Sequence, residues 1–315
     1  MHSAATACFI PTRDYDLAAT LASGQAFRWS LRDGAWEGVV GSRWVRLRQR
    51  EDGIEVETVV PVAGWNWLTD YLQSELDLGS ILRTFPEDEP MRASVAACRG
   101  LRLLRQEPWE CLASFILSST KQIVQIEQIV ALLCARFGEP VEAPAGFGPV
   151  HAFPTAARLA AASEAELRAC KMGFRAPNLL ATARRVANGE MDLRSLRSRP
   201  AAEAREALVA LPGVGEKIAN CVLLFAYGFQ DAFPVDVWVA KAIRQLYFPK
   251  RRPTPQRLRR FVGTYFGPNA GYAQQYLFHF VRTHRIPQLF AKAPSVVSRR
   301  SAEGSFLGSS RIKKV

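Results

Sequence analysis

The sequence of 315 residues lacks the features of membrane and secreted proteins. No stretch approaches the roughly 18 uninterrupted apolar residues of a membrane span, so we expect no transmembrane helix and no membrane partner. The first residues, MHSAATACFIPTRDYD, contain no basic stretch followed by an apolar one, so we expect no secretory signal. The protein is therefore expected on the cytosolic or nuclear side of membranes.

Closely spaced cysteines are also missing. None of the six cysteines forms a CxxC pair, and the nearest two, Cys98 and Cys111, are 13 positions apart. This spacing argues against a zinc knuckle or an iron–sulfur loop, so we expect no metal site. In a reducing compartment the six cysteines are expected to be free thiols.

Acidic residues are fewer than basic ones. Asp and Glu number 29 against 41 Lys and Arg, a net charge of +12, while 48% of the residues are hydrophobic. Such a composition is typical of a globular protein, and the length favours more than one packed unit. The positive charge favours a polyanionic partner, because basic groups release counterions from phosphates, although many soluble proteins are simply basic.

Hydrophobic periodicity divides the chain into a β part and an α part. Residues 20–60 contain partly alternating apolar and polar segments separated by turn dipeptides, which predict antiparallel strands at 36–40, 44–48 and 54–59. Near residue 65 the period becomes helical and stays so to about residue 290. The predicted domains are a sheet domain at 1–85, a helical domain at 86–290 and a basic, disordered tail at 291–315. The tail is either dispensable or a non-specific DNA-binding arm.

A glycine-rich segment, Leu211-Pro-Gly-Val-Gly215, separates predicted helices at 201–210 and 217–227. Two glycines allow a tight turn that exposes successive backbone N–H groups beside a helix N-terminus. This pattern predicts a helix–hairpin–helix motif over about 201–227, whose residues Gly213, Val214 and Gly215 contact the DNA backbone without reading sequence. A glycine-rich connection with no ligand is the alternative.

Two residues after the hairpin stands Lys217, and 19 residues later Asp236 follows in Phe233-Pro-Val-Asp236. A lysine in a pocket near a carboxylate can serve as an amine nucleophile. The simpler alternatives are a solvated surface lysine and an aspartate that only caps the helix predicted at 237–247.

Four segments, in order from about residue 9 to 285, together resemble the 8-oxoguanine DNA glycosylase/AP lyase family of helix–hairpin–helix glycosylases. The first is LASGQAFRW at 21–29, and the second is LRLLRQEP at 101–108 together with Cys111 and residues 115–119. The third is LPGVGEKIANC at 211–221 together with FPVD at 233–236. The fourth is GPNAGYAQ at 267–274 and extends to Phe278. The resemblance implies an α+β fold, in which a TATA-box-binding-protein-like antiparallel sheet domain packs on two all-helical subdomains.

The resemblance also implies a role for each residue of the catalytic site. Lys217 would attack C1′ of the damaged nucleotide, and Asp236 would assist electrostatically while capping its helix. The carbonyl of Gly24 would accept the N7–H that 8-oxoguanine has and guanine lacks. Gln274 would contact the Watson–Crick edge of the flipped base, and Phe278 and Cys221 would cover its two faces, although a core aromatic and a buried thiol remain alternatives.

On the strand opposite the lesion the chain departs from the family. Thr120 begins Thr-Lys-Gln where the family has an Asn run beside the orphaned cytosine, and Trp238 replaces a His that touches the DNA backbone. Arg175 matches an arginine that hydrogen-bonds this cytosine, and Phe174 stands where a wedging Tyr is common. Opposite-base recognition is therefore only partly supported.

These implications favour a bifunctional enzyme that flips out and excises 8-oxoguanine from duplex DNA, where it is paired with cytosine, and then cuts the abasic site by β-elimination. We expect a monomer without a cofactor, located at the nucleoid of a bacterium or in the nucleus of a eukaryote. An alkyl-base glycosylase of the same scaffold would lack Lys217, and an endonuclease-III-like enzyme would carry a C-terminal four-cysteine cluster. A non-catalytic hairpin DNA-binding protein is the alternative from another class.

Overall fold

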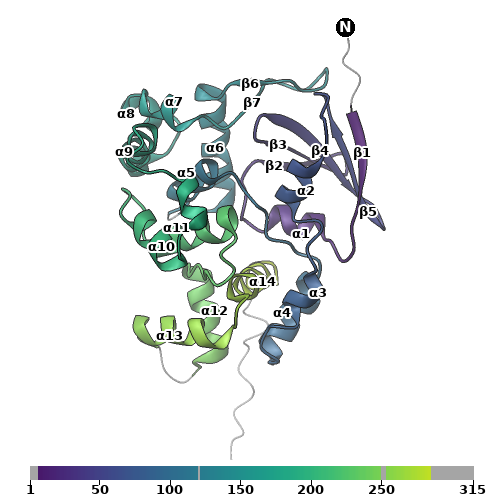
Figure 1. The fold of residues 1–315 in the computed structure, drawn as a ribbon, viewed down its shortest axis with the longest axis vertical. Coiled ribbons are helices and arrows are strands. Elements are labelled where there is room, and N and C mark those ends of the chain that lie inside the picture. Colours follow the sequence, from purple (N-terminus) through teal and green to yellow (C-terminus); the bar gives the residue numbers. More distant parts are fainter. Residues whose placement is uncertain (1–5, 120, 250–252, 285–315) are drawn as a thin grey trace, which may run out of the picture. The chain divides into compact units, whose positions relative to one another are not determined.

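A computed structural model describes residues 6–119, 121–249 and 253–284 (Figure 1). The N-terminal part is a five-stranded antiparallel sheet with the strand order β1-β5-β4-β3-β2. Its strands are β1 (Thr6–Pro11), β2 (Trp29–Arg32), β3 (Ala35–Val40), β4 (Arg43–Gln49) and β5 (Gly53–Thr58). The three strands predicted from alternation correspond to β3, β4 and β5, so the predicted antiparallel sheet domain is confirmed.

The start of the predicted β region was wrong, because helix α1 (Leu17–Ala22) overlaps it. The Asp16 side chain caps α1 by accepting a hydrogen bond of 2.8 Å from the backbone N–H of Ala19. β1 precedes this helix and pairs with β5 along its whole length. This pairing joins residues 42 to 52 positions apart, from Pro11 with Gly53 to Thr6 with Thr58, and local alternation carries no information about it.

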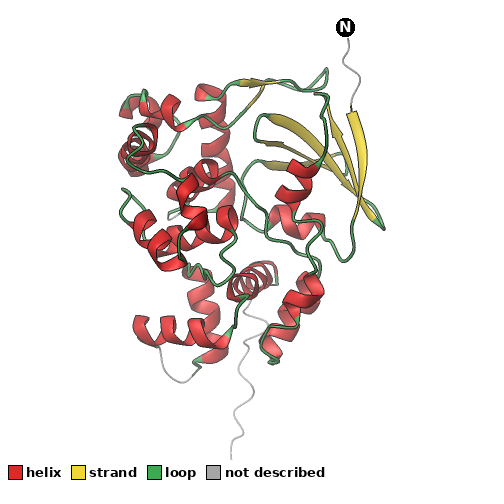
Figure 2. Cartoon of the chain, viewed as in Figure 1, coloured by secondary structure: helices red, strands yellow, loops and turns green. Residues whose placement is uncertain are grey.

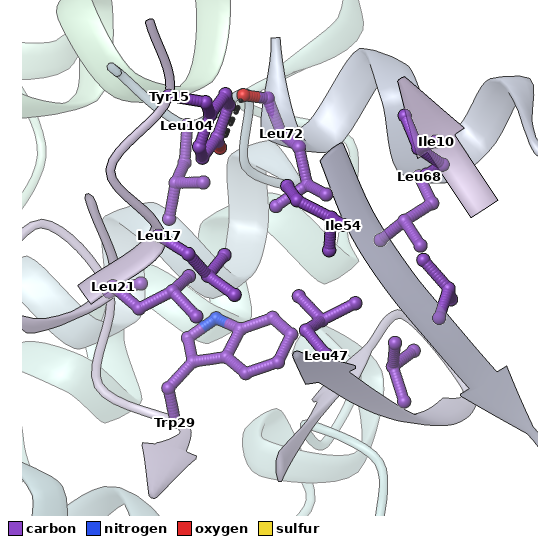
Figure 3. Packing of buried hydrophobic residues seen from close by; sticks show 13 residues of the cluster. Ile10, Tyr15, Leu17, Leu21, Trp29, Leu47, Ile54, Leu68, Leu72 and Leu104 are labelled. Carbon is purple, nitrogen blue, oxygen red and sulfur yellow. Dashed lines mark hydrogen bonds between the residues drawn. The ribbon is translucent and has the colours of Figure 1, made fainter. Parts of the chain in front are cut away.

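The core of the sheet domain lies between the sheet and two helices, α1 and α2 (Asn66–Leu72) (Figure 3). Leu17 and Leu21 of α1 and Leu68 and Leu72 of α2 face the strand residues of the cluster. Each such fully buried leucine contributes about 1.5–3 kcal/mol relative to an exposed one. The Tyr15 hydroxyl donates to the carbonyl of Leu72 at 2.8 Å, so its polar end is satisfied inside this core.

The rest of the described chain is mainly helical (Figure 2). The further helices are α3 (Leu78–Leu82), α4 (Glu89–Cys98), α5 (Pro108–Leu117), α6 (Ile123–Phe137), α7 (Ala156–Ala160), α8 (Glu164–Ala169), α9 (Ala176–Ala187), α10 (Ala201–Val209), α11 (Glu216–Val222), α12 (Val237–Tyr247), α13 (Pro255–Tyr265) and α14 (Ala270–Thr283). One group packs α5 on α9 and α11, and α7 on α9, while the other packs α14 on α4 and α12. The predicted α+β fold, with an antiparallel sheet followed by helices, is thus confirmed.

A short ribbon that the sequence did not predict interrupts the helices. β6 (Pro140–Val141) pairs with β7 (Val150–His151), and Val141 packs in a buried cluster with Val39 and Trp44 of the sheet. No helix among the described residues is long and apolar enough to cross a membrane. The predicted tail at 291–315 lies outside the described residues, and the domain boundaries at 85 and 290 stay predictions.

Candidate active site

The glycine-rich hairpin connects α10 to α11, as predicted. Gly213 has φ +78°, and a Cβ at this position would lie 2.8 Å from the Cβ of Asn178, so only glycine fits. Val214 is buried and anchors the loop. Gly215 is the extended N-cap of α11, and a Cβ there would meet nothing within 4 Å. The hairpin therefore combines an anchored turn with an open backbone at Gly215, which is the geometry that docking on a phosphate needs.

We predict that Gly215→Leu weakens binding to damaged and undamaged duplex DNA alike. The new side chain has room in the free protein and an ordinary backbone conformation, so it obstructs only the approach of a phosphate. The loss of one or two charge-assisted hydrogen bonds, at about 1.5–3 kcal/mol each, corresponds to at least a tenfold weaker affinity. Fluorescence anisotropy over a salt series measures this, and the wild-type affinity should fall steeply with salt.

The matched control is Gly64→Leu, since Gly64 also has open space around the position of a Cβ but lies outside the hairpin. This variant should bind DNA like the wild type. If Gly215→Leu binds undamaged DNA as tightly as Gly64→Leu does, the docking role of the hairpin is wrong.

Lys217 lies in the first turn of α11 and its side chain reaches α5. Its Nζ donates a hydrogen bond of 3.0 Å to the Oγ of Ser118, and it lies 5.1 Å from the centre of the Phe115 ring. The hydroxyl of Ser118 donates in turn to the carbonyl of Phe115 at 2.7 Å, so its lone pairs are free to accept from the amine. Lys217 is therefore held over an aromatic ring at the inner side of a cleft, and the alternative of a solvated surface lysine is wrong.

Asp236 is the N-cap of α12, where its Oδ1 accepts a 2.7 Å hydrogen bond from the backbone N–H of Val239. Burial raises the pKa of this carboxyl, while the capping N–H and the charge of Lys217 act to lower it. The capping role is thus real. Asp236 also lines the pocket that contains Lys217, so it is available for a second role besides capping α12.

A cleft of about 910 Å³ opens beside these two residues, a size typical of ligand sites. It is lined by residues of α6, α12 and α14 and continues into a smaller inner pocket. The inner pocket brings together all six residues predicted for catalysis and base binding, which are Gly24, Lys217, Cys221, Asp236, Gln274 and Phe278.

Two residues that line the inner pocket, Cys221 and Gln274, are buried. Cys221 is 3% exposed, and burial raises the pKa of its thiol to about 11, so it is a neutral wall and no nucleophile near neutral pH. Gln274 is also buried, and its Oε1 has no hydrogen-bond partner among the described residues. An unpaired buried acceptor is costly unless a ligand supplies the donor. Gln274 is therefore prepared to accept from an N–H group.

The backbone of Gly24 lines the same pocket. Its φ is +77°, and a Cβ would lie 2.4 Å from the Cδ1 of Ile123 and 2.9 Å from an Nη of Arg282. Alanine at this position would therefore be strained and would collide with both neighbours. No donor in the described chain hydrogen-bonds the Gly24 carbonyl.

Of the residues predicted to face the opposite strand, Phe174 and Arg175 line neither the cleft nor the inner pocket. Thr120 is one of the residues that the structure does not describe. Phe174 is 61% exposed, as a wedging side chain would be. Arg175 is only 3% exposed, with its guanidinium 4.3 Å from the centre of the Phe174 ring and its Nη1 donating to the carbonyl of Met172. Arg175 is therefore largely covered in this conformation.

The sequence did not single out several residues that line the site. Ser118 directly follows α5 and accepts the hydrogen bond from Lys217. In the sequence, only its position in the Ser-Ser pair before the Thr-Lys-Gln segment pointed to a role in the site. Arg282 lines the cleft from α14, four residues after Phe278 and eight after Gln274, a helical spacing that could have revealed it. Trp238, which the sequence did single out as the replacement for a His that touches the DNA backbone, is 47% exposed and lines the same cleft.

Comparisons with known proteins identify the family. Residues 7–112 match the N-terminal domain of 8-oxoguanine DNA glycosylase, and residues 113–267 match the HhH-GPD superfamily of base excision DNA repair proteins. The N-glycosylase/DNA lyase OGG1 of Arabidopsis thaliana is 33% identical over 301 residues, which cover 88% of this chain and 81% of that protein. The chain belongs to the 8-oxoguanine DNA glycosylase family.

A further relative and a solved structure show similar levels of identity. The N-glycosylase/DNA lyase of Saccharomyces cerevisiae is 31% identical over 256 residues, 73% of this chain and 68% of that protein. A Clostridium acetobutylicum 8-oxoguanine glycosylase/lyase, solved with DNA containing cytosine opposite 8-oxoguanine, superposes with a TM-score of 0.81 at 30% identity. The match covers 88% of this chain and 98% of that one, so the likeness extends over the sheet and both helical groups.

Proposed function

We infer that this protein is a bifunctional DNA repair enzyme that excises 8-oxoguanine from duplex DNA and then cleaves the abasic site. One observation supports this best: an amine, a carboxylate, a free backbone carbonyl and an unpaired amide oxygen line a single pocket. The names of its relatives as N-glycosylases and DNA lyases point to the same two activities.

The catalytic pair accounts for both steps. The amine of Lys217 attacks C1′ as the bond between C1′ and the base breaks, and the base departs with the electron pair and takes up a proton. The sugar ring then opens to a Schiff base on Nζ. The imine acidifies C2′, so loss of a C2′ proton expels the 3′ phosphate. The carboxylate of Asp236 stabilises the positive charge that develops on the sugar during base departure.

The acceptors of the pocket account for the choice of base. The Gly24 carbonyl accepts from the N7–H of 8-oxoguanine, whereas the N7 of guanine offers only a lone pair that opposes it. A flipped purine also presents the N–H groups of its Watson–Crick edge, which match the unpaired Oε1 of Gln274. A mismatched polar group in a dry pocket discriminates more strongly than a small difference in shape.

Covalent trapping tests the proposed function against its alternatives. Incubation with an 8-oxoguanine duplex and borohydride should reduce the imine and leave a stable protein–DNA complex. An alkyl-base glycosylase without a lysine nucleophile would release its base without being trapped, and a non-catalytic DNA-binding protein would do neither. Absence of both base release and trapping on the lesion duplex would overturn the proposal.

We further propose that the substrate is duplex DNA with cytosine opposite the lesion, that the enzyme acts as a monomer, and that it works in the nucleoid or nucleus. Duplex DNA with this pair is the ligand of the Clostridium acetobutylicum enzyme. The net charge of +12 and the open hairpin support a duplex partner.

We predict a weaker preference for cytosine opposite the lesion than an Asn-bearing relative shows. Thr120 offers a hydroxyl where an amide would make more directional hydrogen bonds, and Lys121 reads no base edge well. Arg175 is the other residue predicted to contact the opposite base, and its buried guanidinium packs against Phe174. It must reorient before it can contribute the roughly 1–3 kcal/mol by which one good base contact favours cytosine over other bases. Rates of base release with each of the four bases opposite 8-oxoguanine measure the preference.

The matched variant is Thr120→Asn, which should sharpen the preference for cytosine. Gln122 could instead supply the missing amide, in which case the variant would change nothing. An unchanged Thr120→Asn variant, or a wild type as selective as the Asn-bearing relative, would contradict this prediction.

A further inference from the structure

Four consecutive backbone carbonyls, from residue 22 to residue 25, surround Gly24, which lines the base pocket. Arg282 donates from Nη2 to the carbonyl of Ala22, and Gln275 donates from Nε2 to that of Ser23 at 3.1 Å. The carbonyl of Gln25 accepts from another side chain, Gln106, at 2.7 Å. Within the described chain, the carbonyl of Gly24 alone among the four receives no hydrogen bond.

Two of these three donors come from α14, the helix that also carries the base-binding residues. Arg282 follows Gln274 and Phe278 at successive intervals of four, so the three side chains lie on one helix face. Its guanidinium lies 5.5 Å from the centre of the Phe278 ring, and its Nη1 lies 2.9 Å from where a Gly24 Cβ would be. Arg282 therefore contacts both the residue with the free carbonyl and the ring predicted to cover the base.

We propose that Arg282, assisted by Gln275, is the positioning residue that aims the Gly24 carbonyl and thereby determines the selectivity for the lesion. The proposal rests on the proposed function and adds residues to it. By bonding the carbonyls of Ala22 and Ser23, the two side chains orient the peptide groups that lead to Gly24. The carbonyl they leave open then has a defined direction relative to Phe278 and Gln274.

The physical need for such support follows from the backbone at Gly24. This residue has a positive φ and no side chain, so the loop itself restrains its carbonyl weakly. To distinguish the N7–H of 8-oxoguanine from the N7 lone pair of guanine, the Gly24 carbonyl must lie in the plane of the base and at hydrogen-bond distance from N7. A site residue without a rigid support loses much of its effect. Arg282 is suited to support Gly24, because a planar guanidinium can pack on the Phe278 ring and donate a hydrogen bond to the Ala22 carbonyl at the same time.

The test compares two substrates in single-turnover reactions with enzyme in excess. One is a duplex with 8-oxoguanine, on which base release is measured, and the other is the same duplex with a preformed abasic site, on which strand cleavage is measured. The Gly24 carbonyl acts only on the first, because the second has no base. In Arg282→Lys and Gln275→Met, base release should fall about tenfold more than abasic-site cleavage does, the loss expected for one misdirected hydrogen bond.

Arg282→Lys is the decisive variant because it keeps the positive charge. The charge of Arg282 lowers the pKa of Asp236, so a neutral substitution would also disturb the carboxylate that assists base release and would confound the comparison. Lysine preserves that charge but cannot pack flat on Phe278 while donating to Ala22. Thermal melting verifies that each variant is folded, and Arg260→Lys on the exposed face of α13 is the matched control.

Each outcome is informative. A selective loss of base release in Arg282→Lys, together with wild-type behaviour of Arg260→Lys, supports the proposal. Equal losses on both substrates, or no loss on either, overturn it. If the wild type cleaves the abasic duplex yet does not release 8-oxoguanine, the proposed lesion is wrong, and that result is visible before any variant is measured.

Discussion

Lys217→Gln is expected to form no covalent complex with an 8-oxoguanine duplex under borohydride, and to lower base release and strand cleavage at least about a thousandfold. An amide nitrogen is not a nucleophile and cannot form an imine with the sugar. Glutamine still reaches toward Ser118, so the pocket should remain intact. The affinity for DNA should be retained, because the hairpin docks through its backbone.

Lys121→Gln is the matched control for this experiment. Lys121 lines the same cleft and its substitution removes the same charge, but it lies outside the inner pocket. It should be trapped at close to the wild-type level. Trapping is measured by gel electrophoresis and affinity by anisotropy. A Lys217→Gln variant that is trapped as efficiently as the wild type would show that another amine is the nucleophile.

Asp236→Asn is expected to slow base release by about a hundredfold or more, the scale typical of removing a preorganised electrostatic group. Asparagine caps helices about as well as aspartate, so the bond to the N–H of Val239 and the stability of α12 should survive. Asp236→Ala would lose both the charge and the cap, which costs about 1 kcal/mol in stability. Comparing the two variants by base release and thermal melting separates catalysis from capping.

The pH dependence gives a second readout for Asp236. Burial raises the pKa of its carboxyl, so the carboxylate gains a proton at a higher pH than an ordinary aspartate does. Wild-type base release should therefore decline as the pH falls through this raised pKa, and the decline should be absent in Asp236→Asn, which cannot titrate. A fully active Asn variant would leave Asp236 as a helix cap alone.

Features that depend on neighbours in the chain were predictable from the sequence. The helix predicted at 237–247 is α12, because Asp236 supplies its own cap three residues before the N–H that it accepts from. The hairpin was equally local, since Gly213 and Gly215 define a turn between two helical segments. Alternation and turn dipeptides likewise located the strands that became β3, β4 and β5.

Features that depend on distant segments were not predictable in the same way. β1 is a strand because β5 pairs with it, and the ribbon of β6 and β7 packs against the sheet. Arg175 matched its motif, yet its guanidinium lies under Phe174. A residue's contacts across the fold decide its exposure, and spacing along the chain does not specify them.

The sequence by itself therefore determined the chemical groups of this enzyme: an amine after a hairpin, a capping carboxylate, and a glycine and a glutamine in separate motifs. Only the tertiary structure decided their use. It brings Gly24 and Gln274 into one pocket and occupies the carbonyls on either side of Gly24 with side chains from other segments. The free acceptor that remains is a property of the packed fold, because backbone carbonyls are alike until their surroundings supply or withhold a donor.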